Sequence, residues 1–258
     1  MRTGTAEKLS FRSMYIDFHT HILPEMDDGS GSADMSLQMI RCSLQQRCCC
    51  LLLTPHFYAF RDYPEHFFQK RDRQLRLLNE QRKAPVPLLI PGAEVHYFEG
   101  ITSMRELPGM RIEKSPGILI EMPFGKWSGR MVDDILELNH RGGYQVILAH
   151  IERYISHQKE ATIEKLVSEG VLMQANASFF TEKFTSKKAI RMLEDGLIHL
   201  LGSDCHNLTS RPPNLGDACR LIEEKCGPEM VKSIMDRGMR LLLADAPDTS
   251  RLQEELVL

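Results

Sequence analysis

The chain has 258 residues, of which 42% are hydrophobic and 26% charged, as in ordinary globular proteins. This length suits one large α/β domain, or at most two small ones. The formal net charge is −3, from 32 basic and 35 acidic residues, so no basic excess indicates nucleic acid and no polybasic run indicates an anionic membrane. The longest apolar run, residues 48–53, is far too short to insert across a bilayer.

The start of the chain and its cysteines indicate the cellular compartment of the protein. Residues 1–13 contain basic residues but no apolar core, so they do not resemble a secretory signal. We expect them to be a disordered N-terminal extension and residues 14–258 to form one domain, because no linker-like stretch divides them. The seven cysteines are odd in number and Cys48, Cys49 and Cys50 are adjacent, which is atypical of a disulfide framework. Reduced thiols in a cytoplasmic protein are the simpler interpretation.

Strand-like and helix-like patterns alternate along the chain. Residues 15–18 are predicted as a strand and 34–47 as a helix, and the apolar run over 48–54 is typical of a buried parallel strand. The elements that follow are a helix over 64–82, strands over 88–94 and 117–122, a helix over 128–141, a strand over 145–149, a helix over 161–169, a strand over 171–175, a helix over 186–194, a strand over 199–202 and two or three closing helices. Seven strands alternating with helices predict an α/β fold with a parallel sheet, either closed into a barrel or doubly wound.

Metal-type side chains recur where the predicted strands end. His19 and His21 end the first strand, and Asp204 and His206 follow the seventh. The ends of the second to fifth strands carry His56, Glu94, Glu121 and His150. In parallel α/β barrels the carboxyl ends of the strands meet at one face. We therefore predict that these eight side chains share one pocket.

The spacing of two pairs favours metal chelation. His19 and His21, like Asp204 and His206, are two positions apart, and on a strand such residues point to the same face. Imidazole and carboxylate groups are ligands that divalent transition metals accept. Eight ligands exceed the needs of one tetrahedral ion, so two or three ions that share bridging carboxylates are predicted.

Each candidate taken alone also has an ordinary explanation. A single histidine is more often packed or exposed than bound to metal, and Asp27-Asp28-Gly29 alone indicates a turn. The recurrence of such residues at strand ends is what favours a metal site. The other histidines are expected to be structural or surface residues: His66, His96, His140, His157 and His199.

Two arginines lie just beyond candidate ligands. Arg153 comes three residues after His150, and Arg211 five residues after His206. A guanidinium group binds phosphoryl oxygens bidentately and stabilises charge in a transition state. Either arginine alone is explained equally well by a surface salt bridge, but their placement predicts a hydrolase of phosphate esters. The aromatic segment 57–60 is expected to line its entrance.

These motifs resemble those of the polymerase and histidinol phosphatase (PHP) superfamily. They are most similar to the manganese-dependent tyrosine-protein phosphatases of bacterial capsule and exopolysaccharide loci, over almost the whole chain. The most specific segments are His150-Ile-Glu-Arg-Tyr154 and Ser203-Asp-Cys-His-Asn207. The other matching stretches are Asp17-Phe-His-Thr-His-Ile-Leu-Pro24, Asp27-Asp-Gly29, Thr54-Pro-His56, Gly92-Ala-Glu94 and Arg211-Pro-Pro213.

The resemblance implies a distorted (β/α)7 TIM-like barrel of the PHP type with three manganese ions, although the ligand chemistry also suits iron, cobalt or zinc. The implied ligand sets are His19, His21, Glu94 and Asp204 for one ion, Glu94, Glu121 and His150 for a second, and Asp28, His56 and His206 for a third. Arg153 and Arg211 would hold the phosphate. The implied substrate is phosphotyrosine in the tail of a bacterial tyrosine autokinase that controls polysaccharide export.

Other functions stay open. Cys205 and Arg211 have the C-x5-R spacing of cysteine-based tyrosine phosphatases, but the residues between them lack the glycines of a phosphate-binding loop. On an extended segment Cys205 would also point away from its neighbours Asp204 and His206. The further alternatives are a histidinol-phosphatase-like hydrolase of small phosphate monoesters, a nuclease-like PHP protein, against which the net charge argues, and a non-catalytic metal-binding partner of the kinase. The sequence does not specify an oligomeric state.

Overall fold

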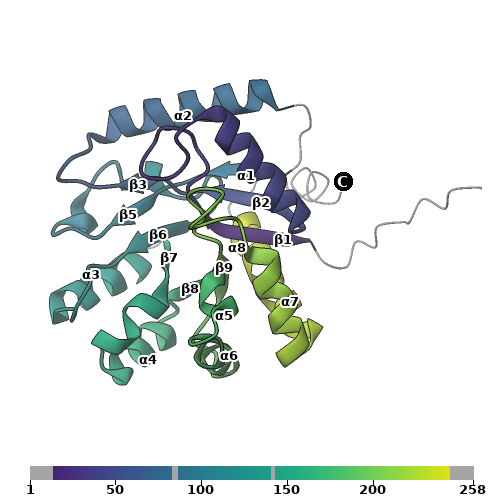
Figure 1. Cartoon of the computed structure of the whole chain (residues 1–258). Helices are drawn as coiled ribbons and strands as arrows, with labels where there is room; N and C mark the ends of the chain where they lie inside the picture. The colour runs from purple at the N-terminus through teal and green to yellow at the C-terminus, as the bar shows by residue number, and fades with distance from the viewer. Residues whose placement is uncertain (1–13, 83–86, 141–142, 245–258) are drawn as a thin grey trace, which may run out of the picture.

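The computed structural model describes residues 14–82, 87–140 and 143–244 (Figure 1). The extension predicted for residues 1–13 lies outside the described residues, as do residues 245–258. Strands gather at the centre of the view in Figure 1, and helices surround them. The fold is a mixed α/β fold, as the alternating patterns predict.

The strands are β1 (Tyr15–Thr20), β2 (Cys48–Leu53), β3 (His56–Phe57), β4 (Leu88–Pro91), β5 (Glu94–His96), β6 (Gly117–Glu121), β7 (Gln145–Leu148), β8 (Leu172–Asn176) and β9 (Leu200–Gly202). The α-helices are α1 (Ala33–Gln45), α2 (Pro64–Gln81), α3 (Gly129–His140), α4 (Glu160–Ser168), α5 (Ala177–Thr181), α6 (Ser186–Glu194), α7 (Leu215–Cys226) and α8 (Pro228–Leu243). Every helix predicted before residue 195 is present, with ends shifted by at most two residues, whereas the short α5 was not predicted. Within the described ranges, no helix is long and apolar enough to cross a membrane.

The strands pair in parallel, and the sheet curls into a half-barrel (Figure 1). Hydrogen bonds join the strands in the orders β1-β2-β4 and β3-β5-β6-β7-β8-β9. The prediction of a single strand over 88–94 is wrong, because Gly92 and Ala93 separate β4 from β5. The two pieces have different partners: β4 pairs with β2, whereas β5 pairs with β3 and β6. The strand is interrupted in the same way at Thr54-Pro55, between β2 and β3, where proline lacks an amide hydrogen for the ladder.

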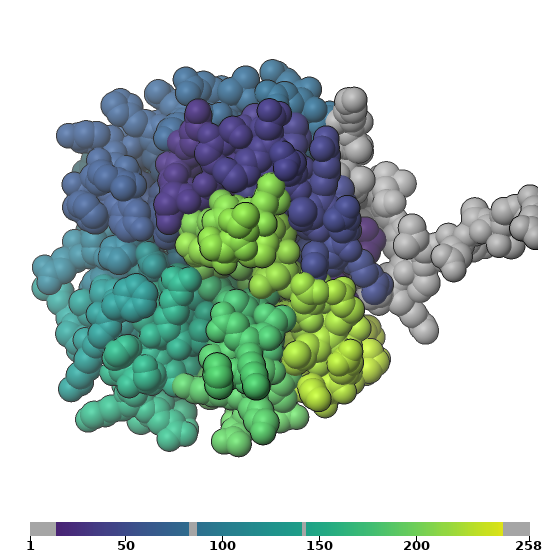
Figure 2. Space-filling view, viewed as in Figure 1, coloured from purple at the N-terminus to yellow at the C-terminus, as the bar shows by residue number. Residues whose placement is uncertain are grey.

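The first strand lies beside the segment that follows the last one. Thr20 forms a parallel bridge with Cys205. The backbone N–H of His21 donates to the Cys205 carbonyl at 3.0 Å, and that of Asp204 donates to the His19 carbonyl at 2.8 Å. Figure 2 shows this yellow-green segment at the centre of the face, against the purple loop that follows β1. Candidate ligands from the two ends of the sequence therefore meet.

Two apolar layers stabilise the sheet. The larger one lies between the strands and the surrounding helices. The smaller one combines strand residues such as Phe18, Leu119 and Ile147 with Leu241 of α8. The Ser115 hydroxyl also donates to the Leu241 carbonyl at 2.9 Å, which fixes the end of α8 beside β6. Side chains thus fill the space between α8 and the sheet.

Candidate metal centre

The predicted ligands converge beyond the carboxyl ends of the strands, and most of them are buried. Two of them have a left-handed backbone: φ is 32° at His150 and 52° at Asp204. Such conformations are costly for residues other than glycine and are found most often at functional sites. At both positions the chain leaves the strand direction, which brings the side chain toward the other candidates.

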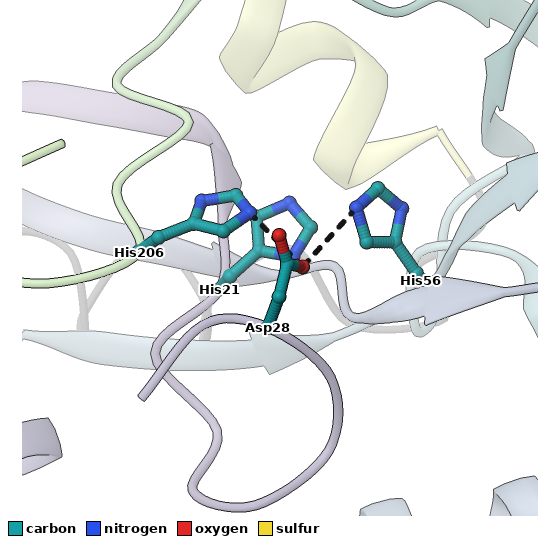
Figure 3. A group of neighbouring side chains, drawn as sticks. All are labelled: His21, Asp28, His56 and His206. Carbon is teal, nitrogen blue, oxygen red and sulfur yellow. Dashed lines mark ion pairs between the residues drawn. The ribbon is translucent and has the colours of Figure 1, made fainter. Parts of the chain in front are cut away.

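The first group of ligand atoms consists of His21, Asp28, His56 and His206, whose atoms lie within 4.8 Å of one another. Figure 3 shows the Asp28 carboxylate between the rings of His56 and His206. Its Oδ1 atom lies 3.6 Å from Nε2 of His56 and 3.4 Å from Nε2 of His206. Asp28 is 67% exposed, so this group lies at the solvent side of the site.

Glu94 lies at the centre of the remaining candidates. Its Oε2 atom is 3.1 Å from His19 Nε2 and 3.3 Å from His21 Nε2. The same oxygen is 2.9 Å from His56 Nδ1, while Oε1 is 2.8 Å from His150 Nε2. One fully buried carboxylate that contacts four imidazoles through both oxygens has the geometry of a ligand shared between ions.

Two further groups of mutually close ligand atoms are His19, His21 and Asp204, and His56, Glu94 and Glu121. This grouping agrees only in part with the sets that the motifs imply. His21 also belongs to the first group, and His56 belongs to both the first and the third. His150 Nε2 lies 2.8 Å from Glu94 and 3.4 Å from Glu121, beside the two acids of its implied set. All nine predicted ligands are thus neighbours in one cluster.

The cluster contains buried polar atoms that lie close to other side chains but make no well-aligned hydrogen bond. These atoms are His56 Nδ1, Glu94 Oε2 and His206 Nε2, the first two of which lie 2.9 Å apart. Buried polar atoms normally make such bonds, so three exceptions among neighbouring side chains require an explanation. Imidazole nitrogens and carboxylate oxygens together form the donor set of manganese, iron, cobalt and zinc sites. The residues therefore fit divalent ions.

Opposite charges compensate one another inside the cluster. Burial alone would raise the pKa of Glu94, but the nearby imidazoles of His19, His150 and His21 hold that pKa well below its usual value. Burial would lower the pKa of His150, but hydrogen bonds to Glu121 and Glu94 raise it to about 9. Because metal ligation needs neutral imidazole, ion binding here would release protons.

Both predicted arginines contact the same oxygen of Asp204. Arg153 Nη2 and Arg211 Nη2 each donate to Oδ2 at 2.7 Å. The other oxygen, Oδ1, lies 3.5 Å from His19 Nε2 and 3.4 Å from His21 Nε2. Asp204 thus connects the arginines to the ligand cluster, and both guanidinium side chains are partly exposed.

Some residues that hold the ligands in place were not predicted. Asp27 Oδ2 accepts hydrogen bonds from His21 Nδ1 at 2.7 Å and from the backbone N–H of His56 at 2.8 Å. An ionised carboxylate only accepts, so the proton lies on Nδ1 and leaves Nε2 of His21 for a metal. The available signal was the position of Asp27 directly before Asp28, but the pattern indicated only a turn.

Two more contacts support ligand side chains. The Tyr154 hydroxyl lies 3.1 Å from His150 Nδ1. His96 Nδ1 lies 3.1 Å from Glu121 Oε2, so this histidine belongs to the edge of the site. Its position two residues after Glu94 on β5 was the signal that could have suggested it.

Two other features lie outside the cluster. Cys205 is fully buried in the apolar core, and this burial raises the pKa of its thiol, so it is neither an accessible nor an ionised nucleophile. Phe57 is also fully buried, so the expectation that it lines the entrance is wrong. Tyr58 does lie beside the ligands, with its ring centroid 5.2 Å from that of His56.

The profile of the family described as "Capsular polysaccharide synthesis, CpsB/CapC" matches residues 15–243. The chain belongs to this family. Within the CpsB/CapC family, the tyrosine-protein phosphatase CpsB of Streptococcus pneumoniae is 29% identical over 241 residues, which cover 89% of this chain and 98% of that protein. The tyrosine-protein phosphatase YwqE of Bacillus subtilis (strain 168) is 28% identical over 241 residues, covering 88% and 91%.

The CpsB/CapC chain is also similar to a solved structure, described as belonging to YwqE from Bacillus subtilis and CpsB from Streptococcus pneumoniae, "unique metal-dependent tyrosine phosphatases". The TM-score is 0.77 at 26% identity, and the match covers 88% of this chain and 94% of the other. The family resemblance inferred from the motifs is therefore confirmed.

Proposed function

We propose that this CpsB/CapC protein is a metal-dependent protein-tyrosine phosphatase that hydrolyses phosphotyrosine. The observation that carries the proposal is the buried cluster of imidazoles and carboxylates with two arginines at its edge. The relatives that are named tyrosine-protein phosphatases support it over almost the whole chain.

The proposed cofactor is manganese, with three ions per chain. One ion would be held by His19, His21, Glu94 and Asp204, a second by Glu94, Glu121 and His150, and a third by Asp28, His56 and His206. The contacts of Glu94 with four imidazoles support a carboxylate shared between ions. Such ions lower the pKa of bound water and neutralise phosphoryl oxygens.

The arginines have a separate task in this proposal. Arg153 and Arg211 would exchange their shared contact on Asp204 for phosphoryl oxygens of the substrate, which are better matched to guanidinium forks. A tyrosine leaving group has a pKa near 10 as the free phenol, so it departs more readily than an alkoxide. Tyr58, which lies beside His56, is placed to contact the substrate ring.

The proposed physiological substrate is the phosphotyrosine tail of a bacterial tyrosine kinase that acts in capsular or exopolysaccharide synthesis, in the cytoplasm. The description of the family as one of capsular polysaccharide synthesis supports this setting.

We also infer that the curved sheet is a seven-unit PHP barrel and that residues 14–258 form one catalytic domain. In this view β2 with β3, and β4 with β5, each count as one interrupted strand.

The test is hydrolysis of a phosphotyrosine peptide by chelator-stripped protein, with and without added Mn²⁺, beside the variant Cys205→Ala. We expect activity to disappear on chelation, to return with Mn²⁺ and to be insensitive to the cysteine change, because the thiol is buried. Activity that survived chelation but vanished in Cys205→Ala would mean a thiolate mechanism. Rapid hydrolysis of histidinol phosphate without hydrolysis of the peptide would favour the small-monoester alternative.

A further inference from the structure

Strand β8 carries none of the predicted ligands, and none follows directly after its end. Instead it carries two amide side chains, Gln174 and Asn176, which are 0% and 4% exposed. Burying an amide costs free energy unless its polar atoms are hydrogen-bonded. A pair of such residues on one apolar strand therefore needs a structural or functional reason.

The hydrogen bonds of Gln174 have only one consistent direction. The backbone N–H of His150 can only donate, and it lies 2.8 Å from Oε1 of Gln174, which is therefore the accepting atom. The same oxygen lies 3.1 Å from Nδ1 of His19, so that nitrogen must carry the proton and donate. The other ring nitrogen of His19, Nε2, faces Glu94 Oε2 at 3.1 Å and is the atom left for a metal.

The hydrogen bonds continue along the strand to a second predicted ligand, Asp204. Gln174 Nε2 donates to Oδ1 of Asn176 at 3.0 Å. Asn176 Nδ2 in turn donates to Oδ2 of Asp204 at 2.8 Å. This bond leaves the other carboxylate oxygen, Oδ1, facing the imidazoles of His19 and His21.

We propose that Gln174 and Asn176 are positioning residues for the metal site: together they set the tautomer of His19 and the orientation of Asp204. This inference rests on the proposed metal-dependent function. When the two arginines leave Asp204 for a phosphate, the bond from Asn176 is the contact that remains on Oδ2 and helps to keep this carboxylate in place. Contacts of this kind behind metal ligands typically change metal affinity by 10–100-fold.

The test is the Mn²⁺ dissociation constant of chelator-stripped Gln174→Met, measured by titration calorimetry, beside its thermal midpoint without metal. Methionine has a similar size but neither accepts from His19 nor donates to Asn176. We expect Mn²⁺ binding to weaken at least tenfold. The smaller change Asn176→Ala, which removes the bond to Asp204, should weaken Mn²⁺ binding about fivefold, as expected for one lost hydrogen bond.

The matched control is Gln145→Met on the neighbouring strand β7. Gln145 Nε2 donates to Asn139 Oδ1 at 3.2 Å and to the Gly170 carbonyl at 2.7 Å, away from every predicted ligand. This variant should lower the thermal midpoint and leave the Mn²⁺ dissociation constant unchanged, which separates a positioning role from a structural one.

Two results would overturn the inference in distinguishable ways. A wild-type protein that bound no Mn²⁺ would overturn the proposed function and this inference with it. Wild-type binding with an unchanged dissociation constant in Gln174→Met would overturn this inference alone. If Gln174→Met does not fold, the same comparison on Asn176→Ala decides.

Discussion

His199 illustrates how one side chain outside the metal cluster makes stability depend on pH. Its Nδ1 atom accepts the backbone N–H of Met173 at 3.1 Å, a bond that requires neutral imidazole. Burial and nearby Arg237 lower its pKa from 6.5 to about 4. Between these values the unfolded chain binds the proton and the folded chain does not, so stability falls as the pH falls from 6.5 toward 4.

The variant His199→Asn should remove this dependence, because its Oδ1 atom takes the position of Nδ1 and can accept the same bond without titrating. The two proteins are compared by how far the free energy of unfolding falls when the pH is lowered from 7.5 to 5. We expect this fall to be about 2 kcal/mol smaller in the variant than in the wild type. Urea unfolding of metal-free protein at the two pH values measures the difference. His140→Asn, at an exposed histidine of α3, is the control and should lose as much stability between the two pH values as the wild type. An equal loss in all three proteins would contradict the argument.

At the level of single residues, the sequence indicated the histidines and acids that meet in the cluster but not the residues that support them. Histidines and acids at strand ends are recognisable because the chemistry restricts the residue type and parallel strands bring their ends together. A supporting residue such as Asp27 or Gln174 only has to place an oxygen beside a histidine nitrogen. Several residue types can do this, and they need not lie at a fixed sequence distance from the histidine. Such contacts become visible only when the strands are placed side by side.

At the level of elements, helices and most strands were predicted from periodicity, but the interruptions of the sheet were not. The apolar run over 88–91 favours a strand, and the signal for the break, the turn dipeptide Pro91-Gly92, has no weight when one strand is extended to Glu94. The exchange of partners between β4 and β5 depends on sheet curvature, which is a property of several strands together. This break separates Glu94 from β4 and places it in the piece that pairs with β3 and β6.

The close approach of β9 to β1 depends on Gly202. A methyl group at this position would lie 2.5 Å from His19 Cβ and 2.9 Å from both the backbone nitrogen of His19 and Nε2 of Gln174. Gly202→Ala should therefore destabilise the metal-free protein by about 1–3 kcal/mol, as overpacking does, and should also weaken Mn²⁺ binding by displacing His19. Thermal unfolding and Mn²⁺ titration calorimetry measure the two effects.

Gly129→Ala is the matched control for this close contact. Gly129 begins α3, and a methyl group there would meet no atom within 4 Å. This substitution should leave Mn²⁺ binding unchanged and stability unchanged or slightly higher, because alanine favours a helix more than glycine does. A Gly202→Ala protein as stable as Gly129→Ala would show that β1 and β9 are less tightly packed than described.

At the scale of the whole molecule, the candidate metal cluster joins the beginning of the fold to its end. Its candidate ligands come from β1 and the loop after it, from β3, β5 and β6, and from the segments after β7 and β9, so ions bound there would hold the curved sheet together. Unfolding must separate these segments, and an ion that binds only the folded chain stabilises it by mass action. At a free concentration one hundred times the dissociation constant, each site contributes about 2.7 kcal/mol.

We therefore expect Mn²⁺ at that concentration to raise the thermal midpoint of chelator-stripped protein by roughly 5–10 °C for each ion bound. Glu94→Gln should lose most of this rise, because the carboxylate contacts four of the imidazoles and an amide is a poor metal ligand. Asp133→Asn, at a carboxylate on α3 that is 74% exposed, should keep the whole rise. A Mn²⁺-induced rise of equal size in Glu94→Gln would mean that the ions bind elsewhere on the molecule, since a cluster without its shared carboxylate could not hold them equally well.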